Sequence, residues 1–367
     1  MRILKWLALL SAGGFGAILL LAPQIVVLWS EGFPSPLWPA RGEFSVLSGA
    51  DKPQSVSGPT PNEGGMALFE ASEGRVLLAE RDGAIFAGAF ATGLDAETRL
   101  NSYSLVKSLI GVLVVKAVAD GKIEGLDASI QHYLPEAPDV SIRSVLMMTS
   151  GLSLRGEPPK DEKQFPADDA SFSPFSPVGR LHAFGIESLA SGLVPDPELR
   201  GVFHYQSVNT ALLGWLLESV YEQPLDEILT EKIWGPAGAS TAYWRRNPSS
   251  GKVSAYCCVY ASASDWLKVG RFLLDNGEAE PFLPEALWRE WILPDLSEKE
   301  RATGAYGWHL RHDILDREAA SVQGPFAYFA GHSGQIVYLL PEQNAVVVRF
   351  GAEPQLLHST LYTLFDQ

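Results

Sequence analysis

Positive charge and cysteine are both scarce in this chain of 367 residues. The 28 lysines and arginines are outnumbered by 43 aspartates and glutamates, which gives a formal net charge of −15. An acidic surface repels phosphate backbones and no cluster of Lys and Arg offsets it, so we expect no nucleic-acid partner. Charged residues make up only 19 % of the chain and hydrophobic ones 46 %, which excludes a disordered or coiled-coil protein and indicates a substantial core.

The two cysteines, Cys257 and Cys258, are neighbours in the sequence. Adjacent cysteines close a disulfide only with strain, so they are not expected to form a stabilising disulfide framework. They lie within the apolar run 253–260. We therefore interpret them as small buried hydrophobic residues rather than as a redox or metal site.

Two signatures of hydrolytic enzymes are also missing. The zinc-protease pattern His-Glu-x-x-His does not occur, and His309 and His312 only imitate a metal pair, because residues three apart in a strand point to opposite faces. We expect no metal and no cofactor. The Gly-x-Ser-x-Gly pattern of α/β-hydrolases is absent too, although Gly331-His-Ser-Gly334 comes close to it and leaves Ser333 as an alternative nucleophile.

One long hydrophobic stretch occurs at the N-terminus. Arg2 and Lys5 precede an uncharged run from Trp6 to Ser30, which at about 1.5 Å per residue is long enough to cross a hydrocarbon core of about 30 Å. Residues 1–30 are predicted to be a transmembrane anchor or a signal segment, and their length favours the anchor. Positive charge before the run predicts that the rest of the chain lies outside the cytoplasm, held at a bacterial inner membrane, or exported if the segment is cleaved.

Composition and periodicity divide the rest of the chain. Proline and glycine are dense between 31 and 65, which we interpret as a tether or a wrapping arm. Strand-like patterns then occupy 66–140 and 300–367, whereas helical and loop patterns dominate 141–299. This order predicts one domain over 66–367, in which an α/β part from both ends of the chain encloses a mainly helical part.

The individual elements follow from the same patterns. Residues 104–119 are apolar on all faces, which is typical of a buried helix. We expect further helices at 210–221, 263–274 and 354–365. We expect strands at 66–71 and 75–80, joined as a hairpin, and at 305–312, 327–330, 335–340 and 345–350, the last two joined through 341–344.

A serine and a lysine three residues apart open the predicted buried helix, in Ser104-Leu-Val-Lys107. Residues three apart share one face of a helix, so the lysine amine can approach the serine hydroxyl. N–H groups at a helix start can stabilise an oxyanion, and burial lets a lysine take part in proton transfer. The pattern alone is weak: Ser249-Ser-Gly-Lys252 repeats it in a predicted turn, and a helix cap would explain Ser104 equally well.

Two other segments can complete a site around this pair. Tyr205 precedes an amphipathic helix, and from there its hydroxyl can enter a cleft where a nearby lysine would lower its pKa. The segment His332–Gln335 lies between two apolar strand runs. Glycine there lets a substrate lie along the strand edge, and a strand N–H can complete an oxyanion hole. Taken alone, Tyr205 would be an ordinary buried aromatic residue.

In this order and spacing, the motifs resemble those of the serine β-lactamase and penicillin-binding-protein superfamily, and most of all its class C-like esterases and 6-aminohexanoate-oligomer hydrolases. The matching positions are Ser104-Leu-Val-Lys107, Tyr205-Gln-Ser207 and His332-Ser333-Gly334. The resemblance covers about residues 67–350. It implies a β-lactamase-like fold of the α/β (α+β) class, with an antiparallel sheet flanked by helices and an inserted mainly helical domain.

The resemblance also implies a mechanism. Ser104 would attack the carbonyl, Tyr205 as a phenolate would take its proton, and Lys107 would hold both hydroxyls. Water would then hydrolyse the acyl-enzyme. The N–H groups of Ser104 and Gln335 would form the oxyanion hole. The residues expected to line the cleft are His332, Ser333, Gly334, Ser207 and Trp308. Trp308 could equally well be a core residue that only packs.

Two positions depart from the family pattern. His332 stands where β-lactam-binding members usually carry a lysine, and Ser207 replaces an asparagine that often contacts a substrate amide. Both favour an ester, linear amide or small peptide as substrate. The alternatives are a true β-lactamase or D,D-peptidase, and a catalytically weak sensor or binding module. Substrate identity depends on loops between about 155 and 195.

Overall fold

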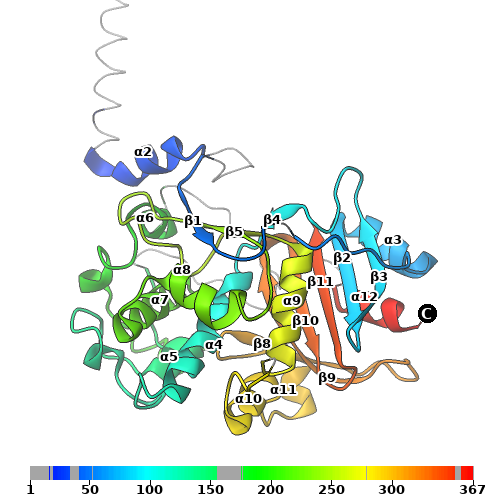
Figure 1. The fold of residues 1–367 in the computed structure, drawn as a ribbon. Helices are drawn as coiled ribbons and strands as arrows, with labels where there is room; N and C mark the ends of the chain where they lie inside the picture. Colours follow the sequence, from blue (N-terminus) through cyan, green and yellow to red (C-terminus); the bar gives the residue numbers. More distant parts are fainter. Residues whose placement is uncertain are drawn as a thin grey trace, which may run out of the picture.

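A computed structural model of the chain describes residues 16, 20–33, 41–51, 53–154, 175, 177–277, 279–351 and 357–366. Figure 1 shows a sheet-containing part beside a mainly helical part. The predicted mixed fold, with an antiparallel sheet flanked by helices, is confirmed.

A seven-stranded antiparallel sheet with the order β3-β2-β11-β10-β9-β8-β7 carries the α/β part. Its strands are β2 (Gly74–Arg81), β3 (Ala84–Phe90), β7 (Ala305–Gly307), β8 (Leu310–Leu315), β9 (Gly324–Gly331), β10 (Gln335–Leu340) and β11 (Ala345–Gly351). Since β2 pairs with β11, the two ends of the chain meet inside this sheet. The strands predicted at 335–340 and 345–350 form the expected hairpin.

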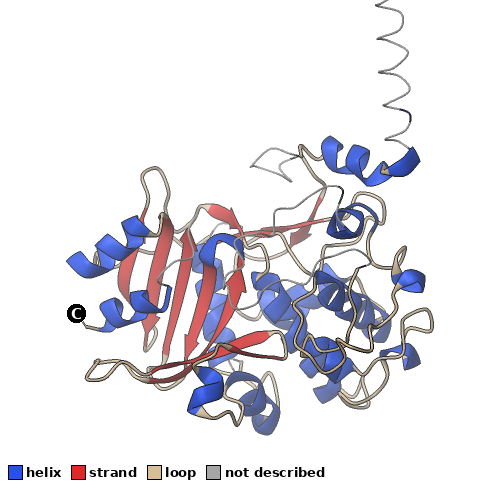
Figure 2. Cartoon of the chain, turned by 180° about the vertical axis from the view of Figure 1, so that it is seen from behind, coloured by secondary structure: helices blue, strands red, loops and turns tan. Residues whose placement is uncertain are grey.

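Helices cover both faces of the large sheet (Figures 1 and 2). On one face lie α4 (Leu105–Ala119) and α9 (Ala263–Leu274); on the other lie α3 (Glu63–Ala71) and α12 (Leu357–Phe365). Successive strand residues point to opposite faces, so Val346 and Val348 join one core cluster and Val347 joins the other. Burial on both faces explains why β11 is apolar along almost its whole length.

The helix α4 is buried on nearly all sides, as its sequence predicts. It packs on α7 (Ser207–Tyr221) as well as on β9 and β10. Each fully buried Leu, Ile or Val contributes about 1.5–3 kcal/mol to the stability of the fold. The helix therefore holds Ser104, the residue directly before it, in a fixed place. Gly111 allows the close packing, because a Cβ there would collide with the carbonyl of Trp308.

The helical part contains a second, four-stranded sheet with the order β1-β5-β6-β4. Its strands are β1 (Phe44–Leu47), β4 (Arg99–Asn101), β5 (Ala242–Arg245) and β6 (Val259–Ser262). The remaining helices are α2 (Pro23–Ser30), α5 (Ile142–Leu146), α6 (Pro177–Phe184), α8 (Leu225–Leu229), α10 (Glu285–Ile292) and α11 (Glu298–Arg301).

The described residues between 23 and 50 contact the helical part. β1 pairs with β5, and α2 packs on α6. Glu31 forms an ion pair with Arg245 at 2.6 Å, and the side chains are 3 % and 0 % exposed. The described residues 41–50 of the Pro/Gly-rich segment are thus packed against the helical part.

None of the described helices is both long and apolar enough to cross a bilayer. Most of the hydrophobic run 6–30 on which the anchor prediction rests lies outside the described residues, and α2 is its last part.

Two predicted strands are wrong. Residues 66–71 belong to the helix α3, because Asn62 caps it by accepting the N–H of Gly65 at 2.8 Å and its buried side is covered by α12. The strand predicted at 305–312 is two strands, β7 and β8. Trp308 and His309 both have positive φ, 52° and 60°, which turns the chain between them.

Candidate active site

Ser104 lies at the N-terminus of α4, directly after Tyr103. Tyr103 has a φ of 46°, which is unusual for a non-glycine residue and turns the chain into the helix. The Ser104 side chain makes no capping hydrogen bond with its own helix. The capping explanation for this serine is therefore wrong, and its hydroxyl points to other partners.

Lys107 follows one turn later and is 2 % exposed. Its Nζ donates to the carbonyl of Tyr256 at 2.8 Å and to Ser207 Oγ at 3.2 Å. It also lies 5.5 Å from the ring centroid of Tyr205 and 5.2 Å from that of Tyr256. A buried ammonium is thus held between two aromatic rings beside the serine.

Tyr205 and Ser207 come from the segment that leads into α7. The phenol of Tyr205 shares a hydrogen bond with the Ser104 side chain, and its ring packs edge-on against Tyr306 at 6.1 Å. Ser207 is the first residue of α7 and accepts from Lys107. Four residues predicted from two separate motifs therefore meet: Ser104, Lys107, Tyr205 and Ser207.

Burial raises the pKa of Tyr205 to about 12; the hydrogen bond with Ser104 and the charge of Arg311 act in the opposite direction but are smaller. We expected a nearby lysine to lower this pKa. The pKa is nevertheless raised overall in the free protein, because the desolvation of the phenol outweighs the hydrogen bond with Ser104 and the charge of Arg311. At neutral pH Tyr205 is a neutral phenol.

The segment His332–Gly334 forms a short 3-10 turn between β9 and β10 instead of continuing a strand. Ser333 and Gly334 have positive φ, 57° and 67°. The exposed ring of His332 packs edge-on against Tyr103, with centroids 5.3 Å apart. Arg349 holds the turn from behind by donating to the carbonyl of Gly334 at 2.7 Å.

Gly331 brings this turn against the start of α4. A Cβ at Gly331 would lie 2.5 Å from the carbonyl oxygen of Ser102 and 3.4 Å from the nitrogen of Ser104, so only glycine fits here. Gln335, which faces Gly331 across the β9–β10 pair, is thereby placed near the Ser104 N–H. Its own N–H donates to the carbonyl of His332, and its side chain bonds to Gly351, away from Ser104.

Trp308 is only 6 % exposed and belongs to the main hydrophobic core, which favours packing over lining a cleft. Its neighbour His309 is a structural residue that the sequence did not single out in this role. Its ring bonds to Thr210 at 2.9 Å and to the carbonyl of Leu146 at 2.8 Å. Burial lowers the pKa of His309 to about 3, so the ring is neutral and links α5 to α7.

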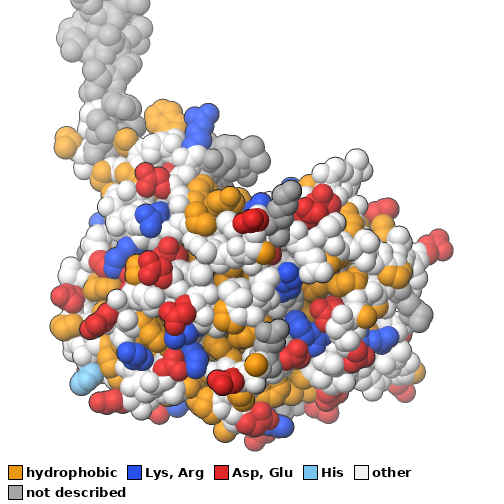
Figure 3. Space-filling view, in the orientation of Figure 1, with side chains coloured by type: hydrophobic (Ala, Val, Ile, Leu, Met, Phe, Trp, Pro, Cys, Tyr) orange, Lys and Arg blue, Asp and Glu red, His pale blue; other side chains and the backbone are white. Residues whose placement is uncertain are grey.

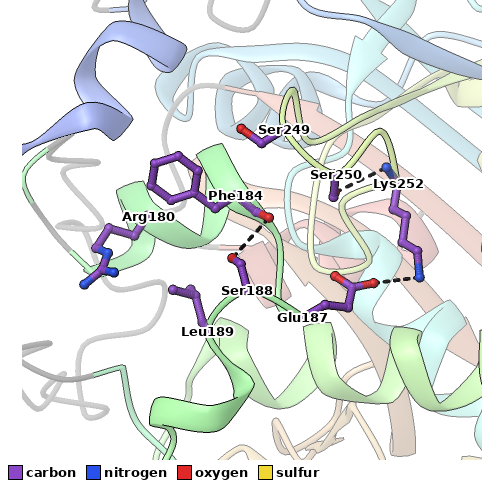
Figure 4. Close-up of a pocket in the computed structure, with 8 residues that line it drawn as sticks. All are labelled: Arg180, Phe184, Glu187, Ser188, Leu189, Ser249, Ser250 and Lys252. Atoms are coloured by element: carbon purple, nitrogen blue, oxygen red, sulfur yellow. Dashed lines mark hydrogen bonds and ion pairs between the residues drawn. The ribbon is translucent and has the colours of Figure 1, made fainter. Parts of the chain in front are cut away.

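The second Ser-x-x-Lys match shows what a chance occurrence looks like. In Figure 4, Ser249 points away from Lys252 at the edge of a cavity of about 510 Å³. Lys252 forms ion pairs at 2.7 Å with Glu187 and with Glu218. A lysine held by two carboxylates cannot activate a serine, whereas Lys107 donates to two neutral oxygens, the Tyr256 carbonyl and Ser207 Oγ.

The interpretation of the cysteines as two free hydrophobic residues is wrong. Cys257 and Cys258 are joined by a disulfide, and both are buried. The positive φ of Cys258, 73°, gives the chain the sharp turn at which neighbouring sulfurs can meet.

Two residues near the site carry no sequence signal of their own. Tyr256 supplies the carbonyl that binds Lys107, and Arg311 supplies positive charge near Tyr205. Tyr256 is recognised only once the fold places it beside Lys107, and Arg311 only once the fold places it near Tyr205. The loop 155–174, where we expected part of the substrate cleft, lies outside the described residues.

Fold and site together define a protein of the β-lactamase-like serine hydrolase class: a nucleophile candidate at the start of a buried helix, a lysine one turn later, a tyrosine from the helical part and a strand-edge turn opposite. The sequence matches the beta-lactamase family over residues 65–355, so the chain belongs to that family. The prediction that it is a serine hydrolase of this family is confirmed at the level of the family.

Solved structures show the same fold at low sequence identity. A protein from Bacillus anthracis described as a 6-aminohexanoate-dimer hydrolase matches with a TM-score of 0.70 and 16% identity, over 93% of this chain and 92% of that one. A D-stereospecific amidohydrolase from Streptomyces matches with a TM-score of 0.61 and 18% identity, over 84% and 99%. EstCE1, a hydrolase with promiscuous acyltransferase activity, gives 0.60 and 17%, over 83% and 96%.

Proposed function

We propose that the protein is an acyl-enzyme hydrolase of small esters or linear amides, with Ser104 as its nucleophile. The observation that carries this proposal is the hydrogen bond between Ser104 and Tyr205 beside the buried ammonium of Lys107. A hydroxyl that is bonded to a proton acceptor rather than to its own helix is available for attack on a carbonyl.

In the proposed reaction, Ser104 Oγ bonds to the substrate carbonyl carbon while Tyr205 takes its proton. Tyr205 acts here in its phenolate form, whose negative charge Lys107 and Arg311 stabilise before the proton arrives. Tyr205 then passes the proton to the leaving alcohol or amine, and the acyl group stays on Ser104. A water loses a proton to Tyr205, attacks the acyl-enzyme and releases the acid, after which the proton returns to Ser104. The Ser104 N–H stabilises the oxyanion, and the Gln335 N–H joins it when substrate displaces its bond to His332.

The chemistry of the turn favours esters and amides over β-lactams. His332 is exposed and is not a permanent cation, so it offers no fixed charge to a β-lactam carboxylate at neutral pH. The amidohydrolase and the 6-aminohexanoate-dimer hydrolase among the proteins of similar fold support the same preference for amide substrates over β-lactams.

We also propose that the catalytic domain works outside the cytoplasm, close to a bacterial inner membrane. In addition to the hydrophobic N-terminal run, Leu20 and Leu21 are each 84 % exposed and Trp29 is 61 % exposed. Figure 3 shows hydrophobic side chains at the end of the molecule where α2 lies, while the surface below it mixes both charges. Exposed leucine and tryptophan side chains beside a hydrophobic segment are typical of a membrane interface.

A fluorophosphonate that cannot cross membranes tests activity and location together. In intact cells that express the full chain, we expect it to form one adduct, which mass spectrometry places on Ser104, and to fractionate with the membrane. Ser104→Ala should abolish the adduct, while Ser249→Ala should leave it unchanged. Loss of the adduct in Ser333→Ala alone would support the α/β-hydrolase alternative instead. No adduct even in purified protein would support a sensor or binding module.

The high pKa of Tyr205 predicts an alkaline pH profile. The phenolate fraction rises about tenfold per pH unit below a pKa of about 12, so log(kcat/KM) for a p-nitrophenyl ester should rise with a slope of about 1 between pH 7 and 9. Tyr205→Phe should remove this slope together with most of the activity. A profile that is already flat above pH 7 would show that the phenolate is not the base.

A further inference from the structure

The loop Ser254–Cys258 lies directly against the catalytic residues proposed above. The Tyr256 carbonyl accepts from Lys107 Nζ at 2.8 Å. Two residues later, the Cys258 N–H donates to the carbonyl of Tyr103, the residue before Ser104, at 3.2 Å. One short loop therefore contacts both the lysine and the backbone that presents the nucleophile.

The other side of the loop is fixed to β5. Its Cys258 carbonyl accepts from the N–H of Arg245 at 3.1 Å, and its Cys257 carbonyl accepts from Trp244 Nε1 at 3.0 Å. The N–H of Ser254 donates to the Arg245 carbonyl at 2.9 Å. The loop is thus a spacer between β5 and the start of α4, and its backbone conformation sets where the Tyr256 carbonyl stands.

That conformation depends on the disulfide between Cys257 and Cys258. Cys258 has a φ of 73°, a region that side-chain-bearing residues rarely adopt, and the bond between neighbouring sulfurs restricts the chain to turns of this kind. Both residues are buried, 7 % and 2 % exposed, so the bond lies inside the domain rather than on a surface loop. Placement outside the cytoplasm would keep it oxidised.

We propose that the Cys257–Cys258 disulfide is a positioning element of the active site, which holds the Tyr256 carbonyl on Lys107 and the Cys258 N–H on Tyr103. Reduction would free the loop from its left-handed turn and loosen both contacts at once. The enzyme is then active with the disulfide closed and impaired with it open. This inference rests on the proposed hydrolase function.

The opening reaction is ordinary thiol–disulfide exchange. A thiolate of a small dithiol attacks one of the two sulfurs, the bond between Cys257 and Cys258 breaks, and the second thiol of the reagent closes its own ring. Two electrons and two protons pass from the dithiol to the protein, which ends with two thiols. Because the chain has only two cysteines, a dithiol can act on no other disulfide.

The test compares oxidised and dithiothreitol-reduced protein, with the thiols counted by alkylation after unfolding. We expect kcat for a p-nitrophenyl ester to fall about 10- to 100-fold on reduction, with little change in KM, since a displacement of about 1 Å in catalytic geometry has effects of this size. Reoxidation should restore kcat. A purely structural disulfide would instead change the thermal midpoint and leave kcat of the folded enzyme intact.

The double variant Cys257→Ala/Cys258→Ala is the matched control. It should show the low kcat of the reduced protein and no response to dithiothreitol. If the variant does not fold, the reversible loss of kcat on reduction of the wild-type protein tests the inference by itself. Equal fluorophosphonate labelling rates of Ser104 in the oxidised and the fully reduced protein would overturn the inference, as would two free thiols in active protein. Absence of labelling in the oxidised protein would instead overturn the proposed function.

Discussion

Replacing Lys107 with methionine is expected to lower kcat/KM about 1000-fold, with most of the loss in kcat. Methionine has similar length and fills the space between the rings of Tyr205 and Tyr256, so the change removes the ammonium and little packing. Without that charge, the phenolate form of Tyr205, which takes the Ser104 proton, loses the cation that lies beside its ring. Acid–base contributions of this kind are worth about 10²- to 10⁴-fold.

Steady-state kinetics on an activated ester checks this expectation, together with the thermal midpoint, which shows that the variant is folded. Lys252→Met is the matched control, since it alters the chance copy of the motif and should leave kcat/KM within about threefold. A Lys107→Met enzyme that keeps wild-type kcat would show that the lysine only packs.

The second large effect concerns the ion pair between Arg245 and Glu31. Arg245 is fully buried and also donates to the carbonyl of His182 at 3.0 Å. Arg245→Met removes the cation that neutralises the buried carboxylate of Glu31, and we expect a loss of about 3–5 kcal/mol in the free energy of unfolding. Urea unfolding measures this loss directly.

A double variant and a surface pair make that measurement specific. Glu31→Leu/Arg245→Met replaces both charges with apolar groups and should recover most of the stability, because neither desolvated charge remains. Arg289→Met breaks an exposed pair with Glu285 and should cost less than about 1 kcal/mol. An Arg245→Met protein as stable as the wild type would mean that Glu31 leaves its site and water replaces the pair.

Much of the fold could be predicted because several elements are long and strongly patterned. The apolar residues of α4, and the continuous runs of β10 and β11, can be explained only by burial. The resemblance of the motifs to a known family then predicted that Ser104, Lys107, Tyr205 and Ser207 lie together, although they come from two distant segments. Hydrophobic burial and helix geometry are local enough to be visible in the sequence.

The errors arise where tertiary contacts decide. The run 66–71 is apolar enough for a strand or a helix, and only Asn62 and the packing of α12 select the helix. Trp308 and His309 turn the chain in left-handed conformations, although neither is a glycine, the residue that usually marks such a turn in a sequence. Likewise, Tyr256 contributes its backbone carbonyl, a group that every residue has. Its role therefore cannot be seen in the sequence and becomes visible only from its position beside Lys107.

The pairing of β2 with β11 has a consequence for when activity arises during biosynthesis. β2 precedes the Ser104 segment, whereas β11 follows the 332–335 turn and is the last strand among the described residues. The sheet cannot close before both strands have been synthesised, and contacts between residues so distant in sequence form slowly. In the export proposed above, the residues before β11 would enter a membrane channel before the sheet can close. The hydrolytic activity would then first arise on the far side.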